Sequence, residues 1–236
     1  MSDTDGTEAG ILTGPEILRQ VAKKRIVIDP FTPTRINPGS YDLTLGGKVA
    51  VYTAVVIPDF EPTQSGGVPG ERVRIRPEAN GDPCLPFTAI PGRNCLDAAQ
   101  PNEIAVHELD ERGFLIRPGI GYLMHTAERV WTDSYVPIID GKSSIGRLFI
   151  LVHFTAGFGD PMFKGQYTLE VMATHPVVIY GGQRFAQIRF HTTVGEILSY
   201  EEAGNYQGSD AMGPVASKSY KQLQMDGHTA AQHRTR

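Results

Sequence analysis

Residues 140–170 read DGKSSIGRLFILVHFTAGFGDPMFKGQYTLE, and this stretch decides both the fold and the candidate site. A polar turn between glycines leads into the apolar segment LFILVHF, which is short and bounded by turn residues, as expected of a buried strand rather than a helix. Glycine, aspartate and proline at residues 157–161 mark the next turn. A second strand-like segment, QYTLEVMA, follows. Strands and turns that alternate this closely predict a β-rich fold.

The polar turn carries a cation and two hydroxyl groups at consecutive positions, Lys142, Ser143 and Ser144, between Gly141 and Arg147. Ammonium, hydroxyl and backbone N–H groups are the donors that a polyphosphate needs. The turn is therefore a candidate phosphate site, although a Lys-Ser-Ser turn is more often a solvated loop.

The segment QYTLEVMA should present two different faces, because side chains alternate along a strand. One face carries Tyr167, Leu169 and Val171, and the other carries Thr168, Glu170 and Met172. Glu170 is then held on a rigid strand beside apolar neighbours. A carboxylate in such a place tends to have a raised pKa and can move protons near neutral pH.

Simpler structural interpretations exist for several of these residues. A salt bridge, for instance between Glu170 and Arg147, would make this glutamate structural. His153 lies within the apolar segment, where we expect a core histidine with satisfied hydrogen bonds. Asp160 directly precedes Pro161 and is typical of a turn residue.

Length and charge limit the class of protein. A chain of 236 residues suits one β-rich domain whose core needs no disulfide or metal. The net charge of −4 argues against binding to a nucleic-acid polymer. No apolar run is long enough to span a membrane, and residues 1–10 are unlike a signal peptide. We therefore expect a cytoplasmic protein with no membrane partner, in which Cys84 and Cys95 are free thiols.

The pattern along the chain predicts one short helix at residues 15–24, with Thr13 as its cap and Ile17, Leu18 and Val21 as its apolar stripe. A surface excursion rich in proline and glycine is expected at residues 77–101. Short strands at regular spacing predict a mostly β fold, a Greek-key or jelly-roll-like barrel. The expected strands are residues 41–45, 48–57, 72–76, 103–107, 113–116, 121–126, 135–139, 149–154, 167–173, 177–180 and 184–192.

These motifs resemble those of the dCTP deaminases, the deaminating branch of the trimeric dUTPase superfamily. GKSSIGRLF is similar to the family motif G-[KR]-S-S-x-x-R-x-G, with Phe149 at the last glycine. TAGFGDPMFKG is similar to T-A-x-x-x-D-P-G-[FW]-x-G, with Met162 at a glycine, and the T-L-E motif is intact. Upstream, INPGSYDLTLGG resembles N-P-x-S-x-D-x-R-L-G, with Thr44 where arginine is common.

The resemblance covers residues 11–220 in collinear order. It implies a distorted jelly-roll barrel of the dUTPase-like type as a single domain over residues 11–220, in which residues 199–220 form a C-terminal lid. It also implies a homotrimer with active sites between subunits. Residues 1–10 are expected to be flexible, and residues 221–236, which show no periodicity, are expected to form a disordered tail.

The resemblance implies hydrolytic deamination of dCTP at cytosine C4, which releases dUTP and ammonia. Glu170 would take a proton from the attacking water, Ser143 and the backbone near Ala156 would position this water, and Arg147 would orient Glu170. The chain lacks the H-x-E and P-C-x-x-C signature of zinc deaminases, so we expect no zinc. Mg²⁺ is expected only as an ion bridging the substrate phosphates.

The resemblance also implies a set of binding residues. Asp160 would accept a hydrogen bond from the deoxyribose 3′-OH, and the backbone around Thr168 would read the pyrimidine edge. Asn205 stands where a lysine is usual and Ser209 where a glutamine is usual, and Lys218 is a candidate replacement for the lost charge. The full set is Lys142, Ser144, Ile145, Gly146, Thr155, Ala156, Asp160, Thr168, Leu169, Tyr200, Asn205, Tyr206, Ser209 and Lys218.

The sequence TAGF at residues 155–158 resembles the corresponding segment of the bifunctional members of the family, which also hydrolyse dUTP to dUMP and pyrophosphate. Three alternatives stay open on sequence alone. They are a dUTP diphosphatase without deaminase activity, a deaminase of 5-modified dCTP, and a non-catalytic nucleotide sensor.

Overall fold

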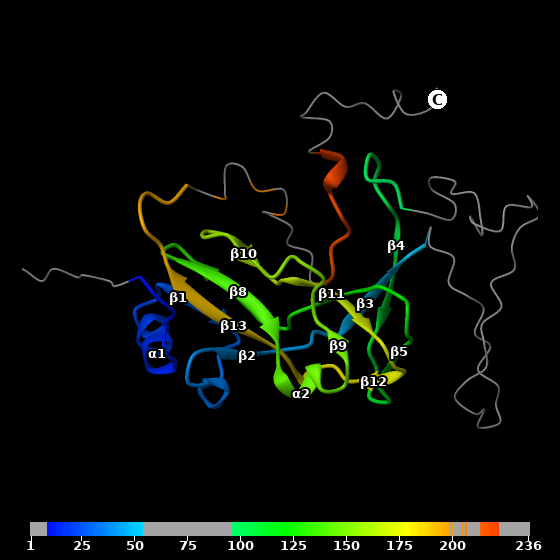
Figure 1. Ribbon diagram of the computed structural model, residues 1–236, viewed down its shortest axis with the longest axis horizontal. Helices are drawn as coiled ribbons and strands as arrows, with labels where there is room; N and C mark the ends of the chain where they lie inside the picture. Colours follow the sequence, from blue (N-terminus) through cyan, green and yellow to red (C-terminus); the bar gives the residue numbers. More distant parts are fainter. Residues whose placement is uncertain are drawn as a thin grey trace, which may run out of the picture. The chain divides into compact units, whose positions relative to one another are not determined.

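The structure is a computed structural model that describes residues 9–53, 96–198, 200, 204, 206 and 213–221. The chain divides into two compact units, one of Met1–Val51 and Ala105–Lys218 and the other of Tyr52–Ile104 and Ser219–Arg236. The elements that build the candidate site belong to the first unit. Figure 1 labels many of the helices and strands along the chain. The domain boundaries expected from the sequence stay a prediction.

The described residues are mostly β, which confirms the expected fold class. The helical elements are α1 (Gly14–Ala22), the 3-10 turn η1 (Pro33–Arg35) and α2 (Ser143–Gly146). The strands are β1 (Ile26–Asp29), β2 (Tyr41–Thr44), β3 (Lys48–Tyr52), β4 (Ile104–Glu108), β5 (Phe114–Ile116), β6 (Tyr122–His125), β7 (Arg129–Thr132), β8 (Tyr135–Gly141), β9 (Ile150–Leu151), β10 (Lys164–Gly165), β11 (Thr168–Ala173), β12 (Val177–Ile179) and β13 (Arg184–Thr192).

The strands form sheets in which neighbours are often distant in the sequence. The sheet orders are β1-β7-β10, β4-β3-β6-β11-β9, β12-β5 and β2-β13-β8. The long strand β13 pairs antiparallel with β2 on one side and with β8 on the other. In this register Gln187 lies opposite Asp42 of β2 and opposite Asp140 of β8, so the three polar side chains share one face of the sheet.

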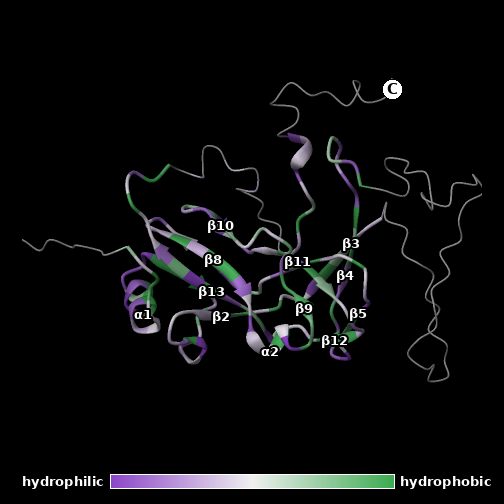
Figure 2. Cartoon of the chain, in the orientation of Figure 1, coloured by the Kyte–Doolittle hydropathy of each residue, from purple (hydrophilic) through white to green (hydrophobic). Residues whose placement is uncertain are grey.

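The opposite face of this sheet is apolar and belongs to the core. Phe185, Ile188 and Phe190 of β13 are completely buried, as are Tyr41 and Leu43 of β2. Figure 2 shows both hydrophobic and hydrophilic segments along β8, and burial alternates along the strand, as its two-residue period requires. Core packing on one face therefore fixes which side chains β8 and β13 present on the other.

Most of the expected strands are present, with ends that shift by at most two residues. These are the expected strands at 41–45, 103–107, 113–116, 121–126, 135–139, 167–173, 177–180 and 184–192. The strand expected at 48–57 begins as β3, but residues 54–57 lie outside the described residues, as does the whole strand expected at 72–76. The strands β1, β7 and β10 were missed.

The prediction of a strand at residues 149–154 is mostly wrong, because only Ile150 and Leu151 form a strand. Phe149 has φ 57°, in the left-handed region, which turns the chain away from a strand path. Met162 has φ 68°. Phe149 and Met162 are the two positions where the family motifs carry glycine, so the backbone keeps the glycine conformation although the side chain has changed.

Helix α1 confirms the expected helix, but its buried face differs from the expected stripe. Leu18 is 46% exposed, and the buried position is taken by Gln20, which is 5% exposed. Thr13 occupies the N-cap position, but its side chain makes no capping hydrogen bond. Instead, Pro15 stands in the first turn, where a missing N–H costs nothing.

Lys24 follows α1 with φ 60°, at the position where helices most often end on glycine. Arg25 N donates to Gln20 O at 3.0 Å, as in a Schellman motif. A left-handed conformation costs an L-residue roughly 1–2 kcal/mol, and glycine avoids this cost. Glycine also gives the unfolded chain more conformational freedom, which offsets part of the gain.

Lys24→Gly should therefore raise the free energy of unfolding by about 0.5–1 kcal/mol, as measured by urea unfolding. Lys23→Gly is the matched control. Lys23 lies in the right-handed region with φ −79°, so glycine there should lower the free energy of unfolding or leave it unchanged. Equal effects of the two substitutions would contradict this interpretation of the helix end.

Candidate active site

The polar turn of the sequence is a single helical turn, α2, which follows directly on β8. Ile145 N and Gly146 N donate to Lys142 O, both at 2.9 Å, so Lys142 forms the N-cap. Ile145 is buried and anchors the turn in the core. Ser143, Ser144, Gly146 and Arg147 are left exposed, as a phosphate-binding turn requires.

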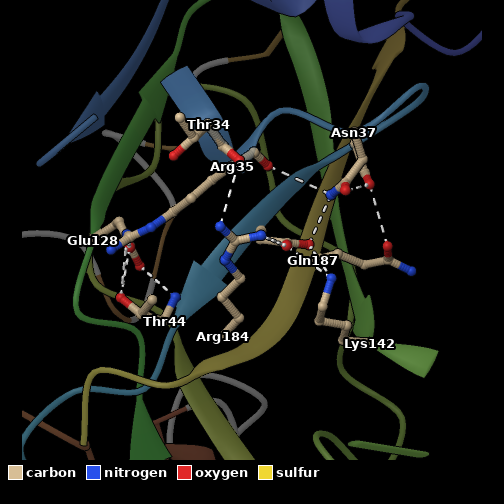
Figure 3. Close-up of polar contacts among 10 residues, drawn as sticks. Thr34, Arg35, Asn37, Thr44, Glu128, Lys142, Arg184 and Gln187 are labelled. Atoms are coloured by element: carbon tan, nitrogen blue, oxygen red, sulfur yellow. Dashed lines mark hydrogen bonds and ion pairs between the residues drawn. The ribbon is translucent and has the colours of Figure 1, made fainter. Parts of the chain in front are cut away.

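Lys142 is held by a buried carboxylate. Asp42 on β2 is completely buried, and Lys142 Nζ lies 2.9 and 2.8 Å from its two oxygens. Asn37 Nδ2 donates to Asp42 Oδ1 at 2.7 Å, and Arg184 Nη1 donates to Oδ2 at 3.3 Å (Figure 3). The ammonium expected to contact phosphate is thus paired with a buried carboxylate of the same chain, so Lys142 positions the turn.

A second buried carboxylate lies against Thr44, which stands where the family motif carries arginine. Glu128 is completely buried and accepts hydrogen bonds from Thr44 N at 2.9 Å and Thr44 Oγ1 at 2.7 Å. Arg35 of η1 forms an ion pair with the same carboxylate (Figure 3). A guanidinium is therefore present beside Thr44. Asp42, Glu128 and Arg35 were not predicted as site residues, although Asp42 stands inside the N-P-x-S-x-D motif.

A cavity of about 580 Å³ opens beside α2. It is bordered by the loop before β2, by the exposed face of the β8–β13 pair and by the turn itself. Its lining residues are Asn37, Pro38, Gly39, Ser40, Asp140, Lys142, Ser143, Ser144, Arg147, Gln187 and Arg189. The side chains of Ser143, Ser144 and Arg147 make no hydrogen bond or ion pair with another described residue, so their donors are available to a ligand.

Glu170 lies on β11 with the alternation that the sequence predicts. Leu169 and Val171 are buried, whereas Thr168 and Glu170 face the other side. Burial raises the pKa of the Glu170 carboxyl above its usual value, and the hydrogen bond from Phe154 N at 3.4 Å and the charge of nearby His153 oppose this shift. No ion pair joins Glu170 to Arg147 in the part of the chain that the structure describes. The raised pKa suits a group that must both take up and release a proton.

His153 is not the satisfied core histidine that its apolar neighbours suggest. Its Nε2 lies 3.7 Å from Asp140 Oδ1, and its Nδ1 is buried with no hydrogen-bond partner in the described chain. A Cβ atom at Gly157 would lie 2.8 Å from His153 Nε2 and 2.5 Å from Ile139 O. The glycine of the TAGF segment is therefore needed so that this loop can close over the imidazole.

The expected lid residues meet the end of β11. Val215 N donates to Thr168 Oγ1 at 3.0 Å, and Tyr206 N donates to the hydroxyl of Tyr200 at 3.3 Å. Lys218 N donates to the Tyr206 hydroxyl at 3.1 Å, while its ammonium lies 5.2 Å from the centre of the Tyr206 ring. The C-terminal segment thus contacts Thr168 through Val215, and Lys218 packs against Tyr206.

The sugar-binding residue expected at position 160 lies near this surface. Asp160 is exposed, and its charge adds to the effect of burial in raising the pKa of Tyr167 and of Tyr200. Thr155 and Ala156 are exposed in the TAGF loop, whereas the side chain of Leu169 is 2% exposed, which leaves only its backbone for a ligand.

The structure brings the expected residues together in two groups. The first group, called the turn group, is Lys142, Ser143, Ser144, Gly146 and Arg147 around the cavity. The second group, called the strand group, is Thr155, Ala156, Asp160, Thr168, Glu170, Tyr200, Tyr206 and Lys218. Within the described residues, no hydrogen bond or ion pair joins Ser143, Ser144 or Arg147 of the turn group to Glu170 of the strand group. Asn205 and Ser209 lie outside these residues, as do Cys84 and Cys95.

Within the residues that the structure describes, no cluster of three or more His, Cys, Asp or Glu side chains could hold a metal ion. No helix among them is long and apolar enough to cross a membrane.

Comparison with known proteins identifies the same family by a family model and by similar sequences. The model of the dCTP deaminase-like family matches residues 11–79 and 80–193. A Leptospira biflexa (serovar Patoc) protein named dCTP deaminase, dUMP-forming, is 36% identical over 204 residues, which are 86% of this chain and 94% of that protein. A Clostridium botulinum (strain Eklund 17B) protein of the same name is 35% identical, with the same coverage.

A solved structure shares the fold. The crystal structure of 2′-deoxycytidine 5′-triphosphate deaminase from Agrobacterium tumefaciens superposes with a TM-score of 0.51 at 20% sequence identity. The match covers 86% of this chain and 55% of that chain. This likeness supports the β fold inferred from the sequence.

The buried Asp42 carboxylate makes a direct prediction for stability. Asp42→Asn would leave Lys142 and Arg184 without their carboxylate, and breaking a buried pair in this way should cost about 3 kcal/mol of unfolding free energy. The measurement is urea unfolding at one fixed protein concentration. Glu108→Gln is the control, because Glu108 is 74% exposed in its pair with Lys48 and should change little. A loss below about 1 kcal/mol for Asp42→Asn would contradict the account.

Proposed function

The chain belongs to the dCTP deaminase-like family, and from this premise we propose that it deaminates dCTP at cytosine C4 and hydrolyses the resulting dUTP to dUMP and pyrophosphate. The names of the Leptospira and Clostridium relatives support the dUMP-forming activity. The observation that carries the chemistry is Glu170, a half-buried carboxyl with a raised pKa on a rigid strand.

The deamination adds water to the ring and removes ammonia. Glu170 takes a proton from the water as the water oxygen bonds to C4, and it passes this proton to the base. Transfer of the proton of the new C4 hydroxyl to the amino group then breaks the C4–N bond, so that ammonia leaves and the C4 carbonyl forms. Ser143 and the backbone near Ala156 position the water. Arg147 orients Glu170. Since one carboxyl serves both proton transfers, its pKa must lie closer to neutrality than that of an exposed glutamate.

The turn group binds the phosphates and the strand group binds the nucleoside. Ser143, Ser144 and the backbone of Ile145 and Gly146 donate to phosphate oxygens. The substrate phosphates, rather than protein carboxylates, would hold a Mg²⁺ ion, which would neutralise part of the triphosphate charge. Asp160 accepts from the 3′-OH, and the backbone at Thr155, Thr168 and Leu169 contacts the base. Tyr200, Asn205, Tyr206, Ser209 and Lys218 belong to the closing lid.

The two groups belong to neighbouring subunits of a homotrimer in this proposal. Support comes from the described residues of one chain, in which no hydrogen bond or ion pair joins Ser143 or Arg147 to Glu170. Large apolar side chains around the same region are more than 40% exposed, as expected of a surface that a second subunit covers. These are Leu148, Phe149, Leu151, Phe154 and Phe158.

Glu170→Gln should keep nucleotide binding and abolish ammonia release from dCTP, because the amide cannot accept the proton of the attacking water. The expected loss of kcat is about 10²–10⁴-fold or more. Glu108→Gln, a surface change of the same chemistry, should retain normal turnover. Substantial ammonia release by Glu170→Gln would remove Glu170 from its assigned role.

Mixing two inactive variants tests the division of the site. Subunits of Glu170→Gln and Arg147→Ala, exchanged at equal amounts, form mixed trimers in which one site of three unites an intact turn group with an intact Glu170. With random mixing, activity should return to roughly a quarter of that of the unmutated protein. A mixture of Ser143→Ala with Arg147→Ala should stay inactive, because both changes damage the same group. Failure of the first mixture after proven exchange would contradict a shared site.

A further inference from the structure

The cavity beside α2 contains three cationic side chains and one carboxylate, Lys142, Arg147, Arg189 and Asp140. A polyphosphate carries several negative charges, so its affinity depends on which of these cations can contact it. Arg147 has no ion-pair partner among the described residues. Lys142 and Arg189 each have one, and the two pairs differ in burial.

Lys142 is committed to Asp42, which is completely buried. Drawing the ammonium away would leave the buried carboxylate with the 3.3 Å contact to Arg184 as its remaining ion pair, and this weaker pairing is unfavourable. Lys142 therefore holds the turn in place, and little of its charge is available to a ligand.

The register of the sheet places Arg189 on the same face as Gln187 and Asp140, but the ion pair that holds its side chain is weak. It lies opposite Ile138, two residues from the position where Gln187 faces Asp140. Its ion pair with Asp140 joins side chains that are 38% and 36% exposed. Solvent-exposed ion pairs contribute little net stability, so the guanidinium can leave Asp140 at small cost. Arg189 Nε also donates to His191 Nε2 at 3.2 Å, which steadies the side chain from the other side.

We propose that Arg189 is a polyphosphate-binding residue, whose guanidinium exchanges the Asp140 carboxylate for a phosphate oxygen when a nucleotide enters the cavity. Asp140 is then an internal competitor, which occupies Arg189 in the free protein and repels the bound phosphate. That the nucleotide is dCTP rests on the proposed function. Arg189 also supplies a positive charge in a chain that has Asn205 where a lysine is usual.

The test is calorimetric titration with inorganic tripolyphosphate. Arg189→Gln should weaken binding about tenfold, the size expected for one charge-assisted hydrogen bond. Asp140→Asn should instead tighten binding, because it frees Arg189 and removes a repelling charge. Both changes break the same ion pair, so a pair with a purely structural role would shift the affinity in one direction or not at all.

Two further variants complete the series. Arg189→Lys keeps the charge without the guanidinium fork, and its affinity should lie between those of Arg189→Gln and the unmutated protein. Arg112→Gln is the matched control, because Arg112 is also paired with a neighbouring aspartate, Asp110, but lies outside the cavity. It should leave the affinity unchanged.

Several results would overturn the proposal. These are an unchanged affinity in Arg189→Gln, a change of affinity in the same direction in Arg189→Gln and Asp140→Asn, and absence of tripolyphosphate binding to the unmutated protein. If Arg189→Gln does not fold, Asp140→Asn alone decides, and any result other than tighter binding rejects the exchange.

Steady-state kinetics separate this proposal from the proposed function. Arg189→Gln should raise KM for dCTP and leave kcat unchanged, as expected when an interaction is equally strong in the ground state and the transition state. If the unmutated protein releases no ammonia from dCTP, the proposed function fails. The tripolyphosphate series then still decides the role of Arg189.

Discussion

The buried charge of Asp42 is the constraint on which the turn group depends. A carboxylate without solvent must be paired, and the partners here are Lys142 at the start of α2, Arg184 at the start of β13 and Asn37 in the loop before β2. One carboxylate thus joins three segments that are far apart in the sequence. With Lys142 drawn inward, the next residues of the helical turn are exposed, and the hydroxyl groups of Ser143 and Ser144 are presented to the cavity.

Glu170 is positioned by a different physical means, the alternation of a strand. Leu169 and Val171 pack into the core, so Glu170 must face the opposite side, where partial burial raises its pKa. Core packing therefore fixes the strand group, and a buried ion pair fixes the turn group. In the proposed trimer a second subunit would bring the turn group of one chain to Glu170 of the next.

The parts predicted from sequence were those governed by short-range patterns. The two-residue period gave the correct faces of β11, and resemblance to family motifs located α2 and Glu170. Long-range pairs had no signal in any local pattern, since Asp42 and Lys142 are 100 positions apart. The ion pair between Arg35 and Glu128 spans 93 positions and was missed in the same way. The strand expected at residues 149–154 failed because Phe149 adopts a glycine-like backbone, which the apolar composition of this segment concealed.

The most direct test of the account is a time course with dCTP and Mg²⁺, in which nucleotides are separated by chromatography and ammonia is assayed in parallel. The account predicts that dCTP is converted to dUMP and pyrophosphate with one equivalent of ammonia and without accumulation of dUTP. Accumulation of dUTP as the final product would contradict the second hydrolysis. Unchanged dCTP without ammonia would contradict the central claim that Glu170 acts in a deaminase.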